Sequence, residues 1–320
     1  MPDKVLVTRR IPAAGLRLLE AEGFALTILS EEVPERAELL EAARGASGVL
    51  STVTESIDAG FMDAAGDNLK VVANMAVGFD NVDVTAARER EIVVTNTPGV
   101  LTETTADVAF MLMLAAARRL GEGERMLRSG RWRYWGPELL TGPDVWGKTL
   151  GIIGMGRIGE AVTRRARGFD MKVLYTSRSR KEGVEHETEA RRVHLDELLR
   201  ESDFISIHTP LTAATRHLIG EPELQKMKPT AVLVNTSRGP VVDEAALAGA
   251  LAEHRIFAAG LDVYEEEPAV HPMLLELENV VLAPHIGSAS IETRSKMAEM
   301  AARNLIAVLH GEEPPNPVNL

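Results

Sequence analysis

The sequence contains no cysteine, which excludes disulfide bonds, thiolate metal sites and a cysteine nucleophile. It has no excess of basic residues either: the formal net charge is −12, which argues against general binding to nucleic acid or to anionic membranes. Long apolar runs are also missing. The longest, Val108 to Ala117, is far too short to span a bilayer, and the N-terminal residues lack the apolar stretch of a signal peptide. We therefore expect a soluble cytoplasmic protein that binds neither nucleic acid nor a membrane.

The histidines lack the spacing of metal ligands. Seven histidines are present besides His285, and no two of them stand at metal-ligand spacing on one predicted helix face. These seven are His186, His194, His208, His217, His254, His271 and His310. The sequence therefore predicts no metal site and no metal catalysis.

What the chain of 320 residues does contain is a repeated pattern of short apolar runs and amphipathic stretches. The first series of apolar runs covers residues 4–8, 24–29, 48–52, 69–75 and 92–96, and the second covers 149–154, 172–177, 204–209, 231–236, 257–263 and 280–284. Apolar runs without polar alternation indicate strands that are covered on both faces, and the strand–helix repetition indicates parallel sheets. The pattern predicts an α/β fold with two doubly wound parallel-sheet domains.

Three further segments stand outside these strand series. Residues 104–120 are rich in alanine, leucine and methionine and apolar nearly all round, which predicts a helix buried between domains or against another subunit. Residues 130–147 hold all three tryptophans and are expected to form an ordered loop. A final helix is predicted at about residues 291–309.

A glycine-rich turn opens the second series. Gly154, Gly156 and Gly159 form a GxGxxG motif that follows a strand and begins a helix, with Arg157 and Ile158 between the last two glycines. In such a turn the first glycine permits the tight bend, the second lets the backbone approach a pyrophosphate, and the third allows close helix–strand packing. The helix N-terminus then presents free amides to the anion. The motif in this context predicts a bound dinucleotide.

The end of the next strand bears on which dinucleotide is bound. NAD enzymes commonly place an acid there for the ribose hydroxyls, whereas this chain has Ser177, Arg178 and Arg180. Arginines can bind a 2′-phosphate through charge-assisted hydrogen bonds, which favours NADP(H). The alternative is a solvated basic turn that tolerates NAD(H).

Three polar side chains that follow later apolar runs suit the reduction of a carbonyl group. Hydride arriving at a ketone carbon leaves negative charge on its oxygen, and His285 can protonate that oxygen. Glu267, hydrogen-bonded to the imidazole, would stabilise its charged form. Arg238 can bind a substrate carboxylate and polarise the carbonyl.

These motifs, in this order, resemble the D-isomer-specific 2-hydroxyacid dehydrogenase family, and within it most resemble the glyoxylate/hydroxypyruvate reductases. The matching stretches are MAVGFDNVDV, NTPGVLTETTADVAF, GIIGMGRIG, HTPLTAATRHLI, VNTSRGPVVDEAAL, GLDVYEEEP and APHIGS. The resemblance covers nearly the whole chain.

The resemblance implies roles for individual residues. Arg238, Glu267 and His285 match the catalytic Arg-Glu-His set of the family. Residues expected to contact the cofactor near its nicotinamide or to line the same cleft are Asn235, Thr236, Asp262, Thr209, Pro210 and Gly287. Val77 and Gly78 match the loop whose backbone amides hold the substrate carboxylate.

The resemblance also implies an architecture. A flavodoxin-like substrate domain would comprise residues 1–98 and 287–320, a Rossmann cofactor domain would comprise residues 99–286, and a cleft that closes between them would exclude water. A homodimer would be built on the helix of residues 104–120 and the tryptophan loop. Trp135 of one subunit would border the active site of the other.

The activity implied is NAD(P)H-dependent reduction of glyoxylate or hydroxypyruvate to glycolate or D-glycerate, with His285 protonating the carbonyl oxygen. Other D-2-hydroxyacid dehydrogenases, of the D-lactate or phosphoglycerate type, remain alternatives for this chain. So does a dinucleotide-sensing corepressor, because such a binding protein can keep the Arg-Glu-His set. A Rossmann hydrolase or methyl-transfer enzyme would explain the glycines but leaves Arg238, Glu267 and His285 without a role.

Overall fold

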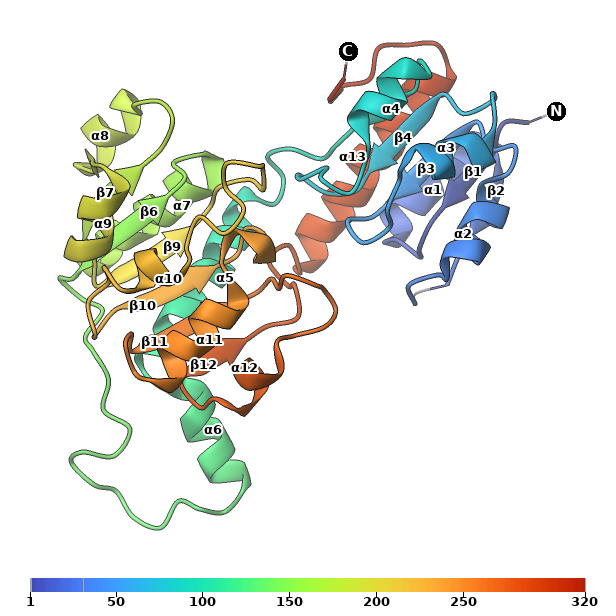
Figure 1. The fold of residues 1–320 in the computed structure, drawn as a ribbon. Coiled ribbons are helices and arrows are strands. Elements are labelled where there is room, and N and C mark those ends of the chain that lie inside the picture. Colours follow the sequence, from blue (N-terminus) through green and yellow to red (C-terminus); the bar gives the residue numbers. More distant parts are fainter. Residues whose placement is uncertain (1, 31, 320) are drawn as a thin grey trace. The chain divides into compact units, whose positions relative to one another are not determined.

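The computed structural model describes residues 2–30 and 32–319. The chain divides into two compact units (Figure 1). The first, here called the split unit, consists of Met1–Leu101 and Ala289–Leu320, and the second, the central unit, is Thr102–Ser288. Within the described residues, every helix is too short or too polar to span a lipid bilayer.

The split unit is a five-stranded sheet covered by helices on both faces. Its strands are β1 (Lys4–Val7), β2 (Ala25–Ile28), β3 (Gly48–Ser51), β4 (Val71–Asn74) and β5 (Val93–Thr95). Every pair is parallel and the order is β2-β1-β3-β4-β5, the order of flavodoxin-type sheets. The helices are α1 (Ala13–Ala21), α2 (Arg36–Ala43), α3 (Ala59–Ala65), α4 (Val84–Glu89) and α13 (Ile291–Leu309).

The two faces of this sheet carry separate apolar clusters. On one face, Val5 and Leu50 pack with Leu305 of α13, and on the other, Val49 and Val72 pack with residues of α2, α3 and α4. Successive strand residues point to opposite faces, so a strand buried on both must be apolar throughout. This explains why the central strands show apolar runs with no polar alternation.

The central unit is a seven-stranded sheet of the same type. Its strands are β6 (Thr149–Ile153), β7 (Lys172–Thr176), β8 (Arg191–Arg192), β9 (Phe204–Ile207), β10 (Val232–Asn235), β11 (Ala258–Leu261) and β12 (Val280–Leu282). All pairs are parallel and the order is β12-β11-β10-β9-β6-β7-β8. The strand order therefore reverses between β6 and β9, where a doubly wound sheet binds its ligand. The predicted fold class, two doubly wound parallel-sheet domains, is confirmed.

The helices of the central unit cover both faces of its sheet. They are α5 (Thr102–Ala117), α6 (Leu120–Arg128), α7 (Arg157–Ala166), α8 (Glu182–Thr188), α9 (Leu195–Glu201), α10 (Glu221–Leu224), α11 (Glu244–Ala252) and α12 (Pro272–Glu276). Short 3₁₀ turns cover Arg167–Phe169 and Gly239–Val241.

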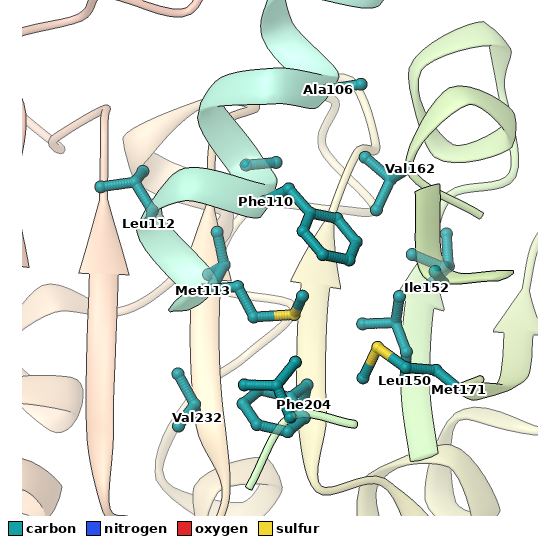
Figure 2. Packing of buried hydrophobic residues seen from close by; sticks show 14 of the residues in the cluster. Ala106, Phe110, Leu112, Met113, Leu150, Ile152, Val162, Met171, Phe204 and Val232 are labelled. Atoms are coloured by element: carbon teal, nitrogen blue, oxygen red, sulfur yellow. The ribbon is translucent and has the colours of Figure 1, made fainter. Parts of the chain in front are cut away.

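Helix α5 is buried largely within its own unit. Phe110 and Met113 face the sheet, with Ile152 of β6 and Phe204 of β9 among the residues opposite them (Figure 2). The helix packs on β10, β11 and α7, so its nearly all-apolar surface is explained without a second domain or subunit on most of its faces. Met111, 46% exposed, marks the side that its own unit leaves open.

Two features differ from the sequence-based expectation. The single helix predicted at residues 104–120 ends at Ala117, and α6 begins at Leu120 after Arg119 adopts a left-handed conformation with φ 51°. The seventh strand, β8, was not predicted, because two exposed arginines carry no apolar pattern.

Candidate active site

The glycine-rich turn joins β6 to α7 at the point where the strand order reverses. Gly154 has φ +97°, and a Cβ there would lie 2.7 Å from the backbone of His208. A Cβ on Gly159 would lie 2.4 Å from the carbonyl oxygen of Gly154, whereas one on Gly156 would meet nothing within 4 Å. The first and third glycines therefore permit close packing, and the middle one faces open space.

Helix α7 presents its first amides beside this open space. Gly156 is the N-cap residue and offers no side-chain cap, and the first backbone bond of the helix runs from Glu160 N to Gly156 O. The amides of Arg157, Ile158 and Gly159 precede that bond and have no intrahelical acceptor. A dinucleotide pyrophosphate fits here, because the positive end of the helix presents its amides beside the open space at Gly156.

The turn after β7 holds Ser177, Arg178 and Arg180 together but also brings an acid to it. The Nε atom of Arg180 donates to Glu185 Oε2 of α8 at 2.7 Å, and Tyr175 Oη donates to Glu185 Oε1 at 2.8 Å. The hydrogen bond from Tyr175, followed by that from Arg180, lowers the pKa of Glu185 below its ordinary value. Arg180 is therefore paired with a carboxylate of its own chain.

A third arginine reaches the same turn from β8. Arg192 donates through Nη2 to the carbonyl of Ser177 at 2.8 Å and to that of Arg178 at 3.3 Å. Sequence reasoning missed Arg192, because it lies in the two-residue strand that had no apolar signal.

The residues after β10 form a tight turn that carries Arg238. The Asn235 Oδ1 atom accepts from the amide and hydroxyl of Ser237 at 3.0 and 2.8 Å, and its Nδ2 donates to the carbonyl of Arg238 at 2.9 Å. Thr236 is buried and Arg238 half-buried. Asn235 thus fixes the backbone from which Arg238 projects. On the neighbouring strand, Thr209 and Pro210 follow the carboxyl end of β9.

Glu267 and His285 form a direct pair. His285 Nδ1 lies 2.7 Å from Glu267 Oε2, and Glu267 Oε1 accepts from the amide of Tyr264 at 3.1 Å. Burial raises the pKa of Glu267, but the hydrogen bond and charge of His285, the Tyr264 amide and the charge of Arg238 together bring it below its ordinary value. Because an ionised carboxylate only accepts, Nδ1 of His285 carries a proton and Nε2 is the nitrogen available for proton transfer.

Asp262 holds the loop that carries His285. Its two carboxylate oxygens accept from the amides of Ile286 and Gly287, both at 2.7 Å, and the amide of His285 donates to the Asp262 carbonyl at 3.0 Å. The side chain is almost fully buried, and burial raises its pKa against the opposing effect of those amides and of His285. Gly287 is further tied to α5, since its carbonyl accepts from Thr105 Oγ1 at 3.1 Å.

Tyr264 and two glutamates, Glu244 and Glu265, fix the loop after β11 that carries Glu267. The sequence analysis assigned no role to these three residues. Tyr264 Oη donates to the carbonyl of Ala283 at 2.9 Å, which links the two loops. The amide of Glu244 donates to Glu265 Oε1 at 2.8 Å, and the amide of Glu265 donates to Glu244 Oε1 at 2.7 Å. Tyr264 and Glu265, which precede Glu267, are therefore held by the residue that follows β12 and by the first residue of α11.

Trp135 is not brought to this site by its own chain. It is 78% exposed in the segment that follows α6, which projects from the central unit (Figure 1). Helix α6 is attached at the amino edge of the sheet, where Arg125 Nη2 donates to the carbonyl of Glu278 just before β12. His285 follows the carboxyl end of β12, at the opposite edge.

Together these features define a dinucleotide-binding α/β protein with a histidine–carboxylate pair at the carboxyl edge of its larger sheet. The family model "D-isomer specific 2-hydroxyacid dehydrogenase, NAD binding domain" matches residues 110–287. The glyoxylate reductase of Korarchaeum cryptofilum is 54% identical over 100% of this chain and 96% of its own length. The chain belongs to the D-isomer-specific 2-hydroxyacid dehydrogenase family, as its motifs predicted.

Solved structures agree with this assignment. A crystal structure of a protein from Thermus thermophilus matches with a TM-score of 0.92 and 49% identity, covering 98% of this chain and 99% of that one. The NADPH-dependent glyoxylate/hydroxypyruvate reductase of Sinorhizobium meliloti, solved with NADP and malonate, matches with a TM-score of 0.86 and 36% identity, covering 99% of this chain and 97% of that one.

The half-buried His208 is expected to make stability depend on pH. Its ring lies at the end of β9, where Nε2 is 2.8 Å from Ser206 Oγ, and burial lowers its pKa from 6.5 to about 3. The unfolded chain takes up a proton as pH falls below 6.5 while the folded chain does not, so stability should fall between about pH 6.5 and 3. The slope from this residue is at most about 1.4 kcal/mol per pH unit.

Urea denaturation of the wild type and His208→Gln at pH 7 and pH 5 measures this effect. The substitution keeps a polar group near Ser206 but does not titrate, so the variant should lose less stability than the wild type between the two pH values. Equal losses would show that His208 is not the group responsible.

Proposed function

We propose that the protein reduces glyoxylate and hydroxypyruvate to glycolate and D-glycerate with a nicotinamide dinucleotide. The observation that carries the proposal is the His285–Glu267 pair, with Nδ1 and Oε2 2.7 Å apart, on the sheet whose reversal point bears the glycine-rich turn. The relatives named glyoxylate reductase, at 54% and 51% identity over the whole chain, support this substrate over D-lactate or phosphoglycerate.

The bound dinucleotide would supply the hydride. His285 gives a proton from Nε2 to the carbonyl oxygen as negative charge develops there. Glu267, ionised and bonded to Nδ1, stabilises the imidazolium form and holds the ring orientation. Arg238, on the turn fixed by Asn235, binds the substrate carboxylate and polarises the carbonyl.

The two domains predicted from the sequence would have separate roles. We assign the dinucleotide to a domain of residues 99–286, with the backbone around Gly154 to Gly159 on the pyrophosphate. We assign the substrate-binding role to residues 1–98 and 287–320, with the amides of Val77 and Gly78 on the substrate carboxylate. Proposed contacts near the nicotinamide come from Thr209, Pro210, Asn235, Thr236, Asp262 and Gly287.

NADP(H) is the proposed cofactor, and NAD(H) is the alternative. Ser177, Arg178 and Arg180 supply hydroxyl and guanidinium donors for a 2′-phosphate, and Arg192 adds positive charge to the same turn. The neighbouring Glu185 opposes this preference, since its carboxylate pairs with Arg180 at 2.7 Å. Arg178 is therefore expected to contribute most to the selectivity.

We further propose that the protein is a homodimer. Large apolar side chains are exposed on α6 and the segment after it: Leu120, Leu127, Trp132, Tyr134 and Trp135 are each at least half exposed. Such a contiguous stretch is typical of an interface rather than of a monomer surface. A second copy would cover it, with Trp135 bordering the partner's substrate. Sedimentation at twice the mass of one chain is expected, and a monomer at micromolar concentration would contradict the proposal.

Removal of the proposed general acid should affect turnover and leave cofactor binding intact. His285→Ala should lower kcat for glyoxylate by about a hundredfold or more, because the developing oxyanion loses its proton donor. Binding of NADPH, followed by its fluorescence, should stay near the wild-type value.

The matched control is His217→Ala. His217 also pairs with a glutamate of the same loop, since its Nε2 lies 2.9 Å from Glu265 Oε2. That variant should keep kcat within a few-fold of wild type. Equal losses in the two variants would mean that the loop, and not the His285 proton, limits turnover.

The double substitution Arg178→Ala and Arg180→Ala should lower kcat/KM for NADPH by about tenfold or more and change that for NADH little, because only NADPH carries the 2′-phosphate. The matched control is Arg191→Ala, which removes a neighbouring arginine that pairs with Glu197 and Glu201 of α9. An equal loss for both cofactors in the double variant would favour a solvated basic turn.

A further inference from the structure

In the loop after β4, three successive carbonyl groups each accept a hydrogen bond. The carbonyl of Ala76 accepts from the amide of Thr97 at 2.8 Å, and that of Val77 accepts from Asn96 Nδ2 at 2.8 Å. The carbonyl of Gly78 accepts from Asn74 Nδ2 at 3.0 Å. These donors come from the end of β4 and from the residues that follow β5, the neighbouring strand.

The direction of the carbonyls determines the direction of the amides. In a trans peptide the C=O and N–H groups point in opposite directions. Since the carbonyls of residues 76–78 each point at one of these donors, the amides of Val77, Gly78 and Phe79 each point away from the donor bound to the preceding carbonyl. Successive amides that are turned outward in this way make a concave site for an anion.

The two asparagines are themselves held in place. Asn74 is fully buried, its Oδ1 accepts from Ser51 Oγ at 3.1 Å, and its Nδ2 also donates to Asn81 Oδ1 at 3.1 Å. Asn81 Nδ2 in turn donates to the carbonyls of Thr52 and Glu55 at 2.9 and 3.0 Å. The carbonyl of Asn96 accepts from Asn304 of α13 at 3.1 Å. In this network Ser51, Asn74 and Asn304 are buried, whereas Asn81 and Asn96 are half-buried. A polar network whose members are all hydrogen-bonded in this way specifies one geometry for the loop it supports.

We propose that Asn74 and Asn96 are positioning residues for the substrate carboxylate. They do not touch the substrate; their Nδ2 atoms hold the carbonyls of Gly78 and Val77, so that the loop keeps its amides turned outward. The inference rests on the proposed function, because the carboxylate is that of the 2-ketoacid. It also explains the residue type: an aspartate of the same shape has no Nδ2 donor, and its charge would repel both the loop carbonyl and a nearby anion.

Loss of the side-chain donor at Asn96 is expected to change the affinity for the substrate and not the rate of turnover. The carboxylate is bound alike in the ground state and in the transition state, so loss of its site raises KM and leaves kcat nearly unchanged. Asn96→Asp should raise KM for glyoxylate about tenfold or more, with kcat within about threefold of wild type and KM for NADPH unchanged. Asn96→Ser, which can still donate a hydrogen bond, should recover part of the affinity.

The variant Asn279→Asp is the control for a loss of stability that has no effect on substrate binding. Like Asn96 Nδ2, which donates to one backbone carbonyl, Asn279 Nδ2 donates to backbone carbonyls, those of Leu251 and Phe257 at 3.1 and 3.2 Å, but it lies in the central unit before β12. Both aspartate variants should lower the Tm, and only Asn96→Asp should raise KM. If both variants changed KM alike, or if Asn96→Asp left KM unchanged, the positioning role would be overturned.

Malonate, a dicarboxylate that is not reduced, gives a readout independent of turnover. Malonate should raise the Tm of the NADPH-loaded protein. For the same rise in Tm, Asn96→Asp should need about tenfold more malonate than the wild type, or a still larger excess. If the wild type reduces glyoxylate and malonate stabilises the variant as well as the wild type, the positioning role is overturned but the proposed function is not. A wild type that neither reduces glyoxylate nor responds to malonate would overturn the proposed function as well.

Discussion

The carboxylate of Asp262 ties together the two loops on which the candidate active site depends. Its oxygens accept from Ile286 and Gly287, and its own carbonyl accepts from His285, so the position of the imidazole is set from the end of β11. Burial raises the pKa of Asp262, which is the cost of placing a carboxylate there. The two amides offset part of that cost. The same bonds hold the loop on which His285 Nδ1 lies 2.7 Å from Glu267 Oε2.

The sheet topology explains why unrelated segments meet at this edge. Parallel strands all end on one side, so the glycine-rich turn after β6, the Arg238 turn after β10 and the His285 loop after β12 share the carboxyl edge. Two of these loops are fixed by a residue at the end of a strand. Asn235, the last residue of β10, holds the turn of Arg238, and Asp262, which follows the neighbouring strand β11, holds the loop of His285. In the split unit, Asn74 has the corresponding place below the loop of Val77 and Gly78.

Much of this was readable from the sequence, for a physical reason. Strands buried on both faces are apolar runs, so the polar residues that follow them, such as Arg238 and His285, are conspicuous. Contacts made by side chains across the fold left no such signal. Glu185 pairs with Arg180 from a separate helix, Arg192 comes from a strand of two exposed residues, and Asn74 is simply the last residue of an otherwise apolar strand. Partners of this kind follow from tertiary packing and not from a local pattern.

The measurement that tests the central claim most directly is the initial rate of glyoxylate reduction by the wild-type protein across a concentration series of NADPH and of NADH. From His285 and Glu267 we expect turnover that saturates with glyoxylate and with the dinucleotide. From the arginines after β7 we expect a higher kcat/KM with NADPH than with NADH. Absence of turnover with glyoxylate and with hydroxypyruvate, under conditions where the protein binds NADPH, would contradict the account and point to a dinucleotide-sensing binding protein.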